Sequence, residues 1–118
     1  MATPSDNLAF MNGVPELLIL HLLSQNEMYG YEIVRAIAQS TGQVIAVGEG
    51  CVYPILHALE KKRWLATRRL TRDGRQRIYY RLTESGRLRM RQSSARWSQL
   101  SGAINDVLGN PHVQQAAL

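Results

Sequence analysis

The chain has 118 residues, 45% of them hydrophobic, and carries a formal net charge of +5. This length suits one ordinary domain. The chain contains no run of 18 or more apolar residues, so no membrane span is predicted. The N-terminus lacks the basic segment and apolar core of a secretory signal, and the single cysteine, Cys51, excludes an intrachain disulfide, so we expect a cytoplasmic protein.

The first predicted helix spans residues 14–25. Pro15 stands near its start, where proline is tolerated because the first N–H groups of a helix have no partner within it. Leucine and isoleucine at positions 17–20, 22 and 23 leave this helix apolar on almost every side. Such a helix has to be covered on more than one side, which a domain this small can hardly do alone. The helix therefore predicts a second chain.

A second helix is predicted from Met28 to Ser40, because Ile33 and Ile37 are spaced to share one face. Gly42 is placed to end this helix in a left-handed conformation. After it, we expect a short extended segment over residues 44–47.

The third predicted helix runs from about Cys51 to Lys62 and contains Pro54. An interior proline costs a helix about 3 kcal/mol. If the helix begins just after Gly50, Pro54 falls in the first turn, where its missing N–H removes no hydrogen bond. The predicted buried stripe consists of Ile55, Leu56 and Leu59. Three side chains spaced four apart form a face that points mostly away from the leucines: Tyr53, His57 and Lys61.

Two strands are predicted at residues 64–70 and 76–82. The dipeptide Asp73-Gly74 between them is a strong signal for a β-hairpin turn. Side chains alternate along the second strand, so we expect one face to be buried and the other to be basic. The expected buried set is Ile78, Tyr80 and Leu82, and the expected basic face carries Arg77, Tyr79 and Arg81.

A final helix of about 25 residues is predicted to follow Thr83, which caps it. At about 1.5 Å per residue it is some 35–40 Å long, more than the preceding domain can cover. Its apolar side chains follow a sparse seven-residue pattern, typical of a seam between helices. One row is Met90, Trp97 and Ile104, and the other is Leu100 and Val107. We expect this seam to meet another subunit in a homodimer.

The positive charge is concentrated in one segment. Residues 61–96 contain thirteen basic and two acidic side chains, whereas residues 1–60 contain one basic and six acidic ones. A basic segment is often only a solvated face, but this one includes a predicted hairpin, which favours a polyanionic partner. Three helices followed by a basic hairpin are typical of a winged helix-turn-helix. In that fold the third helix enters the DNA major groove and the hairpin, or wing, lies along the backbone or minor groove.

The predicted fold class is therefore α+β and mostly α, built as one structural unit. Residues 1–82 would form a winged-helix domain that binds double-stranded DNA, and residues 83–118 a dimerisation helix. The predicted DNA contacts lie on the third helix and the wing: Glu49, Cys51, Tyr53, Pro54, His57, Lys61, Arg72, Arg75 and Arg77. For Tyr53 the alternative is that its ring packs on the core.

Four segments resemble the PadR family of bacterial transcriptional regulators: PELLILHLL, YGYEI, GCVYPILHALEKK and GRQRIYYRLTESGR. They occur in the family's order and cover residues 14–91. The resemblance implies a dimer that binds inverted-repeat operators and releases them on binding a small molecule or on another signal, and we expect a repressor. Two residues depart from the family. Arg63 stands where glycine usually ends the third helix, and Cys51 stands where threonine or serine is common.

The short C-terminus resembles a compact subgroup of that family, which includes multidrug-sensing repressors. There, a tryptophan at the place of Trp97 and its symmetry mate sandwich planar aromatic compounds. Small residues surround Trp97 on its helix and leave room beside the ring. The resemblance thus implies an effector site formed by Phe10, Gly13, Leu17, Trp97, Leu100 and Ser101. The alternative is that Trp97 simply fills the interface.

A protein of a different class is the alternative function: an interaction adaptor with a winged-helix shape but no sequence-specific DNA binding. An enzyme is not expected, because no arrangement of nucleophile, base or paired carboxylates stands out. The histidines lack the spacing of a metal site, and no cofactor is expected. For Cys51 we expect a buried, inert thiol, with a redox sensor as the alternative.

Overall fold

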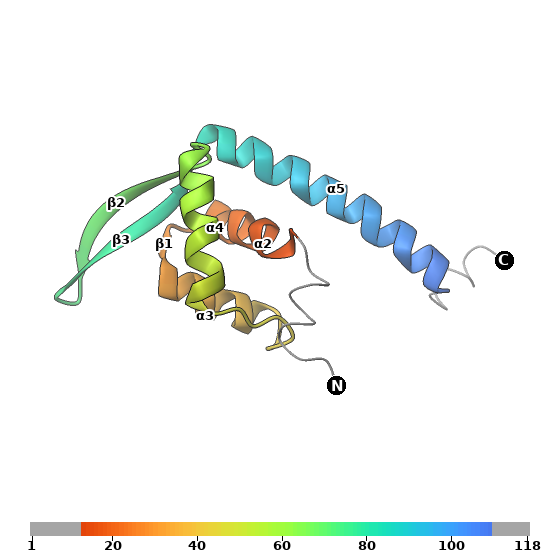
Figure 1. Ribbon diagram of the computed structural model, residues 1–118, viewed down its shortest axis with the longest axis horizontal. Coiled ribbons are helices and arrows are strands. Elements are labelled where there is room, and N and C mark those ends of the chain that lie inside the picture. The colour runs from red at the N-terminus through yellow and green to blue at the C-terminus, as the bar shows by residue number, and fades with distance from the viewer. Residues whose placement is uncertain (1–12, 110–118) are drawn as a thin grey trace.

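The computed structural model describes residues 13–109, and its fold is α+β and mostly helical (Figure 1). The elements follow in the order α2 (Val14–Gln25), β1 (Met28–Tyr29), α3 (Gly30–Ser40), α4 (Glu49–Lys61), β2 (Leu65–Arg72), β3 (Arg75–Leu82) and α5 (Glu84–Leu108). Helices α2, α3 and α4 gather in one body, the β2–β3 hairpin projects from one side of it, and α5 leaves on the other (Figure 1). The predicted winged helix with a long C-terminal helix is confirmed.

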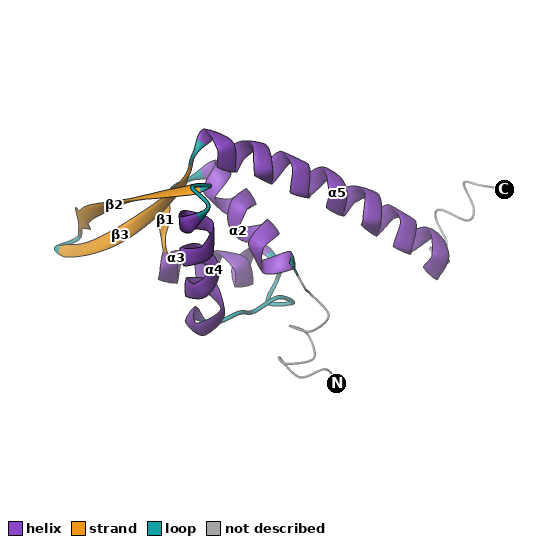
Figure 2. Ribbon diagram, turned by 45° about the horizontal axis from the view of Figure 1, so that its top comes forward, coloured by secondary structure: helices purple, strands orange, loops and turns teal. Residues whose placement is uncertain are grey.

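The sheet has three antiparallel strands in the order β1-β3-β2 and lies at one end of the molecule (Figure 2). The predicted hairpin is confirmed, since Arg72 pairs with Arg75 across a two-residue turn. Asp73 and Gly74 have positive φ angles of 53° and 73°. A two-residue turn with this backbone matches the twist of the strands, and Asp-Gly suits it because both residues tolerate the left-handed conformation.

The second helix begins later than predicted, at Gly30. Met28 and Tyr29 instead form strand β1, which pairs with β3. The backbone N–H of Tyr29 donates to the Glu32 carboxylate at 3.1 Å, which satisfies a free donor at the start of α3. The helical period extends over Met28 and Tyr29, but pairing with a strand some fifty positions away decides their conformation.

The connection from α3 to α4 begins with a turn at residues 41–43. Gly42 ends α3 as predicted, with a φ of 58°. Residues 44–47 form no strand. The Thr41 hydroxyl accepts the N–H of Ile45 at 3.0 Å and donates to the Ile37 carbonyl at 2.9 Å, so it folds this segment back onto the end of α3.

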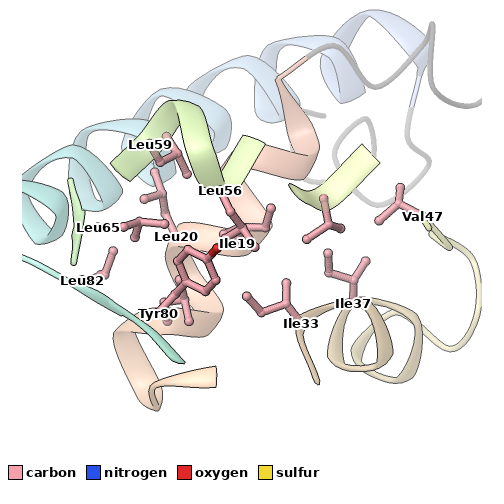
Figure 3. Close-up of a cluster of buried hydrophobic side chains, with 12 residues drawn as sticks. Ile19, Leu20, Ile33, Ile37, Val47, Leu56, Leu59, Leu65, Tyr80 and Leu82 are labelled. Carbon is pink, nitrogen blue, oxygen red and sulfur yellow. The ribbon is translucent and has the colours of Figure 1, made fainter. Parts of the chain in front are cut away.

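Aliphatic side chains from α2, α3 and α4 meet those of the sheet in one core (Figure 3). The most deeply buried are Ile19, Leu20, Ile33, Ile37, Val52, Leu56 and Leu59. The predicted stripe on α4 was wrong at one position, because Ile55 is only half-buried and Val52 takes its place. Val52, Leu56 and Leu59 are spaced by four and three residues, which keeps them on one side of the helix.

Helix α2 is covered on several sides by its own chain, because it contacts α3, α5 and β3. Its buried residues are Pro15, Ile19, Leu20 and Leu23. Leu17, Leu18 and Leu22 are half-buried. The apolar character of α2 is thus largely explained within one chain, and only the apolar side chains of α5 still indicate a second chain.

Helix α4 ends in a left-handed stop at Arg63, whose φ is 64°. The Arg63 N–H donates to the Glu60 carbonyl at 2.9 Å, and the Trp64 N–H donates to the Leu59 carbonyl at 3.0 Å. These two bonds form a Schellman motif, the usual helix stop at a glycine. The stop is kept although the residue is arginine, with a strain of about 1 kcal/mol.

Hydrogen bonds join the end of α4 to the start of α5. The Thr83 hydroxyl donates to the Arg63 carbonyl at 2.7 Å and accepts the Gly86 N–H at 3.0 Å, so Thr83 caps α5 as predicted. The Ser85 hydroxyl donates to the same Arg63 carbonyl at 3.2 Å. Gly86 has no room for a side chain, since a Cβ there would lie 2.0 Å from the Trp64 carbonyl oxygen.

Beyond its first turns, α5 carries apolar side chains that residues 13–109 leave exposed. Met90 packs against the core, but Trp97, Leu100 and Ile104 are 45%, 49% and 50% exposed, and Val107 is 87% exposed. None of the helices in residues 13–109 has the length and hydropathy needed to cross a membrane.

Candidate nucleic-acid interface

Four of the six predicted DNA contacts on α4 are exposed and form its outer face. Glu49, Pro54, His57 and Lys61 are exposed, and Cys51 and Tyr53 are half-buried against the core. The Tyr53 ring packs on the core, as the alternative predicted, and it also lines a hollow on the outer surface.

Pro54 lies in the second turn of α4, not in the first turn as predicted. The helix begins at Glu49, because the Gly48 carbonyl already accepts the N–H of Val52 at 3.1 Å. Pro54 consequently leaves the Gly50 carbonyl without its helical partner. Gly50 is exposed, so water can satisfy this carbonyl. The cap lies two residues earlier than the sequence suggested.

The wing presents three of the predicted arginines. Arg72 and Arg75 flank the tip of the hairpin and are exposed. Arg77 is half-buried, and its guanidinium lies 4.4 Å from the centre of the Tyr29 ring. A cation over the face of an aromatic ring is attracted to it, so Tyr29 holds Arg77 at the border between the wing and α4.

An aromatic stack closes part of the sheet face opposite the core. Tyr79 is only 2% exposed there, with the Tyr29 ring edge-on at 5.4 Å and the Arg72 guanidinium 4.5 Å from its ring centre. The prediction of an exposed Tyr79 was therefore wrong. Ile78, which was predicted to be buried, is 47% exposed, because it faces the space between the wing and α4 instead of the core.

Glu27, which precedes β1, holds two arginines of the wing. Its carboxylate accepts hydrogen bonds from Arg68, one of them from Nε at 2.9 Å, and from Arg72 Nη2 at 3.3 Å. The hydrogen bond from Arg68 is the main cause of the lowered pKa of Glu27, and it raises the pKa of Arg68. Sequence reasoning missed this cluster, because 41 positions separate Glu27 from Arg68.

A hollow of about 410 Å³ lies between α4, the start of α3 and the wing. It is lined by Tyr29, Gly30, Tyr31, Tyr53, His57, Arg77, Ile78 and Tyr80. The sequence singled out Tyr53, His57 and Arg77 among these, and the structure brings the three together. Tyrosine hydroxyls, an imidazole and a guanidinium around one concavity can donate hydrogen bonds to a phosphate backbone or to base edges.

A second concavity, of about 510 Å³, lies between the start of α2 and α5. The predicted effector residues Gly13, Leu17, Trp97 and Leu100 line it, together with Val14, Glu16, Arg89, Gln92, Ser93 and Arg96. Ser101 is not part of the lining, and its hydroxyl donates to the Ser98 carbonyl at 3.2 Å. Phe10 lies outside the described residues. The sequence did not single out Arg89, which approaches Glu16 at 3.7 Å.

Known proteins resemble this chain over most of its length. Residues 19–92 match the PadR-like family of transcriptional regulators. The transcriptional regulator Rv3488 of Mycobacterium tuberculosis is 30% identical, over 85% of this chain and 88% of its own. A PadR-like transcriptional regulator from Bacillus cereus has a similar structure, with a TM-score of 0.77, 28% identity, and coverage of 86% of this chain and 97% of its own.

One similar structure includes nucleic acid. It is PadR of Bacillus subtilis in complex with operator DNA, with a TM-score of 0.61, 26% identity, and coverage of 67% of this chain and 46% of that one. The motifs that pointed to this family are the segments that build α2, α3, α4 and the wing. The chain belongs to the PadR-like family of transcriptional regulators and is a regulator rather than an enzyme.

Proposed function

We propose that this regulator is a homodimeric repressor that binds inverted-repeat operator DNA and releases it when a planar aromatic compound occupies the groove beside Trp97. The observation that carries the proposal is the placement of the polar outer face of α4 next to the basic wing, with the hollow between them. Family membership and the similarity to a PadR protein in complex with operator DNA support DNA as the partner.

The N-terminal half of α4 would enter the major groove, as the second helix of a helix-turn-helix does. The proposed base contacts are Glu49, Cys51, Tyr53, Pro54 and His57, and the proposed phosphate contacts are Lys61, Arg72, Arg75 and Arg77. Arg75 makes no ion pair within residues 13–109, so its charge is free for a phosphate. Arg72 already contacts Glu27 and Tyr79, so a phosphate has to compete with the Glu27 carboxylate for it.

Two copies are proposed to meet along α5, where Trp97, Leu100 and Ile104 form an exposed apolar row. Residues 83–118 then serve dimerisation, and residues 1–82 form the DNA-binding domain. An inverted repeat places two major grooves about 34 Å apart, so the dimer has to hold its two α4 helices at that spacing.

The groove beside Trp97 is proposed as the effector site, because a half-exposed indole there borders a space of about 510 Å³. A flat aromatic compound would stack on the ring. Such a ligand shifts the operator equilibrium only by its preference for a dimer geometry that does not fit DNA.

The DNA-binding proposal is tested by selecting duplexes from a random pool and measuring affinity at physiological salt. Compared with a scrambled duplex of equal length, we expect a preference of at least about 10³-fold. His57→Ala should reduce this preference, whereas Glu84→Gln, at the start of α5, should not. Equal affinity for the selected duplex, the scrambled duplex and heparin would instead indicate an interaction adaptor.

A further inference from the structure

Glu27 is not among the residues proposed to contact DNA. It lies in the short connection between α2 and β1, and its side chain is only 18% exposed. The carboxylate accepts from both Arg68 and Arg72 on the wing. These two arginines are four positions apart on β2, on the sheet face that also carries Tyr79.

The two arginines are held differently from the others of the wing. Two nitrogens of the Arg68 guanidinium, Nε and Nη2, donate hydrogen bonds to the Glu27 carboxylate. Arg72 is fixed on two sides, by Glu27 at 3.3 Å and by the Tyr79 ring at 4.5 Å. In contrast, Arg69, Arg75, Arg77 and Arg81 form no ion pair within residues 13–109.

We propose that Glu27 lowers the affinity of the wing for DNA because it competes with phosphates for Arg68 and Arg72. The inference rests on the proposed function, in which the wing meets the DNA backbone. A carboxylate and a phosphate compete for the same guanidinium fork, because both accept paired hydrogen bonds from it. About half of the Arg68 and Arg72 side chains is exposed, 55% and 51%, so a phosphate can reach them once the carboxylate is gone.

This role lowers affinity without changing the preference for one DNA sequence over another. Phosphate contacts are the same for every DNA sequence, so withheld arginines reduce binding to all duplexes alike. Contacts from α4 to bases are unaffected by Glu27. The carboxylate therefore makes the wild-type protein depend more on its base contacts than its arginine count suggests.

The test compares the salt dependence of DNA affinity for the wild type and Glu27→Gln, with a scrambled duplex as the probe. Each arginine that gains a phosphate contact steepens the slope of log K against log salt by about 0.9. Between 50 and 200 mM salt this corresponds to an extra loss of affinity of about 3.5-fold for each arginine released. We expect Glu27→Gln to bind more tightly at 50 mM salt and to show this steeper slope.

Two comparisons separate this role from a general charge effect. Glu84→Gln changes the net charge equally, but Glu84 makes no ion pair within residues 13–109, so its slope should match the wild type. In a background of Arg68→Ala and Arg72→Ala, Glu27→Gln should have no further effect on the slope. Glu27→Asp keeps the charge on a shorter side chain and should give an intermediate slope.

Two results would contradict this role of Glu27, and a third would contradict the proposed function. A Glu27→Gln protein that is folded, binds more weakly and has a flatter slope would mean that Glu27 presents the arginines to DNA, and the inference would be wrong. It would also be wrong if Glu27→Gln and Glu84→Gln had the same slope. A wild-type protein that bound neither the selected nor the scrambled duplex would refute the proposed function itself.

Discussion

The tip of the Tyr53 ring on α4 lies against the backbone of Gly30, the first residue of α3. A Cβ at position 30 would come within 2.4 Å of both Cζ and the hydroxyl oxygen of Tyr53. The glycine thus sets how closely the outer face of α4 approaches the β1–α3 junction, and with it the shape of the hollow beside the wing.

Replacing this glycine should displace the tyrosine. In Gly30→Ala the methyl group occupies the place of the phenol, and the Tyr53 ring has to rotate away. We expect a folded protein with operator affinity reduced by about tenfold, the size of one lost base or backbone contact of about 1.4 kcal/mol. Fluorescence anisotropy with the selected duplex measures the change. In a Tyr53→Ala background, Gly30→Ala should cause no further loss, and an additive loss would contradict the argument.

The two exposed arginines at the wing tip should differ in their contribution to DNA binding. Arg75→Ala removes a free charge and should reduce the salt slope by about 0.9 for each protomer bound. Arg72→Ala removes a charge that Glu27 already shares, so its effect on the slope should be smaller. Affinity measured between 50 and 200 mM salt distinguishes them. Equal slopes for the two variants and the wild type would show that the wing tip does not meet the backbone.

The left-handed stop at Arg63 predicts a stabilising substitution. Glycine adopts a φ of 64° without the contact that Cβ makes there, so Arg63→Gly should raise the free energy of unfolding by about 1 kcal/mol. Urea denaturation followed by circular dichroism measures it. Arg63→Ala keeps the strain and loses the charge, and it should not be stabilised. If Arg63→Gly and Arg63→Ala were stabilised equally relative to the wild type, the lost charge and not the relieved backbone strain would be responsible.

Two glycines of α5 should respond in opposite ways to alanine. Gly86 lies against a backbone carbonyl that cannot move aside easily, so Gly86→Ala should lower the free energy of unfolding by about 1–3 kcal/mol. Among residues 13–109, no neighbouring atom lies within 4 Å of a Cβ built at Gly102, so Gly102→Ala should gain up to about 1 kcal/mol from helix propensity. The unfolding midpoints of the two variants should therefore lie on opposite sides of the wild-type value.

If an aromatic effector binds in the groove as proposed, its binding should change the fluorescence of Trp97. The chain has two tryptophans. The Trp64 ring has Lys62 and Arg89 near its face, each 4.9 Å from the ring centre, whereas Trp97 lines the groove. Titration with a planar aromatic dye should quench the wild type and Trp64→Phe, but not Trp97→Ala. Quenching that persists in Trp97→Ala would place the ligand elsewhere.

The sequence predicted the elements well where local pattern determines them. The hairpin turn at Asp73-Gly74, the cap at Thr83 and the stop at Gly42 depend on neighbouring residues and could be inferred from them. Prediction from the sequence failed where contacts with distant residues decide the local structure. Strand β1 exists because β3 pairs with it, although residues 28–29 continue a helical pattern.

The candidate interface was predicted in outline and missed in detail. The exposure of His57 and Lys61 on α4 was inferred correctly from helical spacing, whereas Tyr53 also packs on the core. The burial of Tyr79 could not be inferred, because it depends on Tyr29 and on the guanidinium of Arg72 across the sheet. Nor could the pairing of Glu27, since nothing near it in the sequence marks a partner on the wing.

The bonds that join Arg63 to Thr83 and Ser85 have a mechanical consequence. Because these bonds and a close backbone contact at Gly86 hold the end of α4 against the start of α5, we expect the two helices to move together. A tilt of α5 at its far end would be carried to the C-terminal end of α4 instead of being absorbed between them. In a dimer joined along α5, a small molecule inserted between the two α5 helices would therefore change the distance between the two α4 helices.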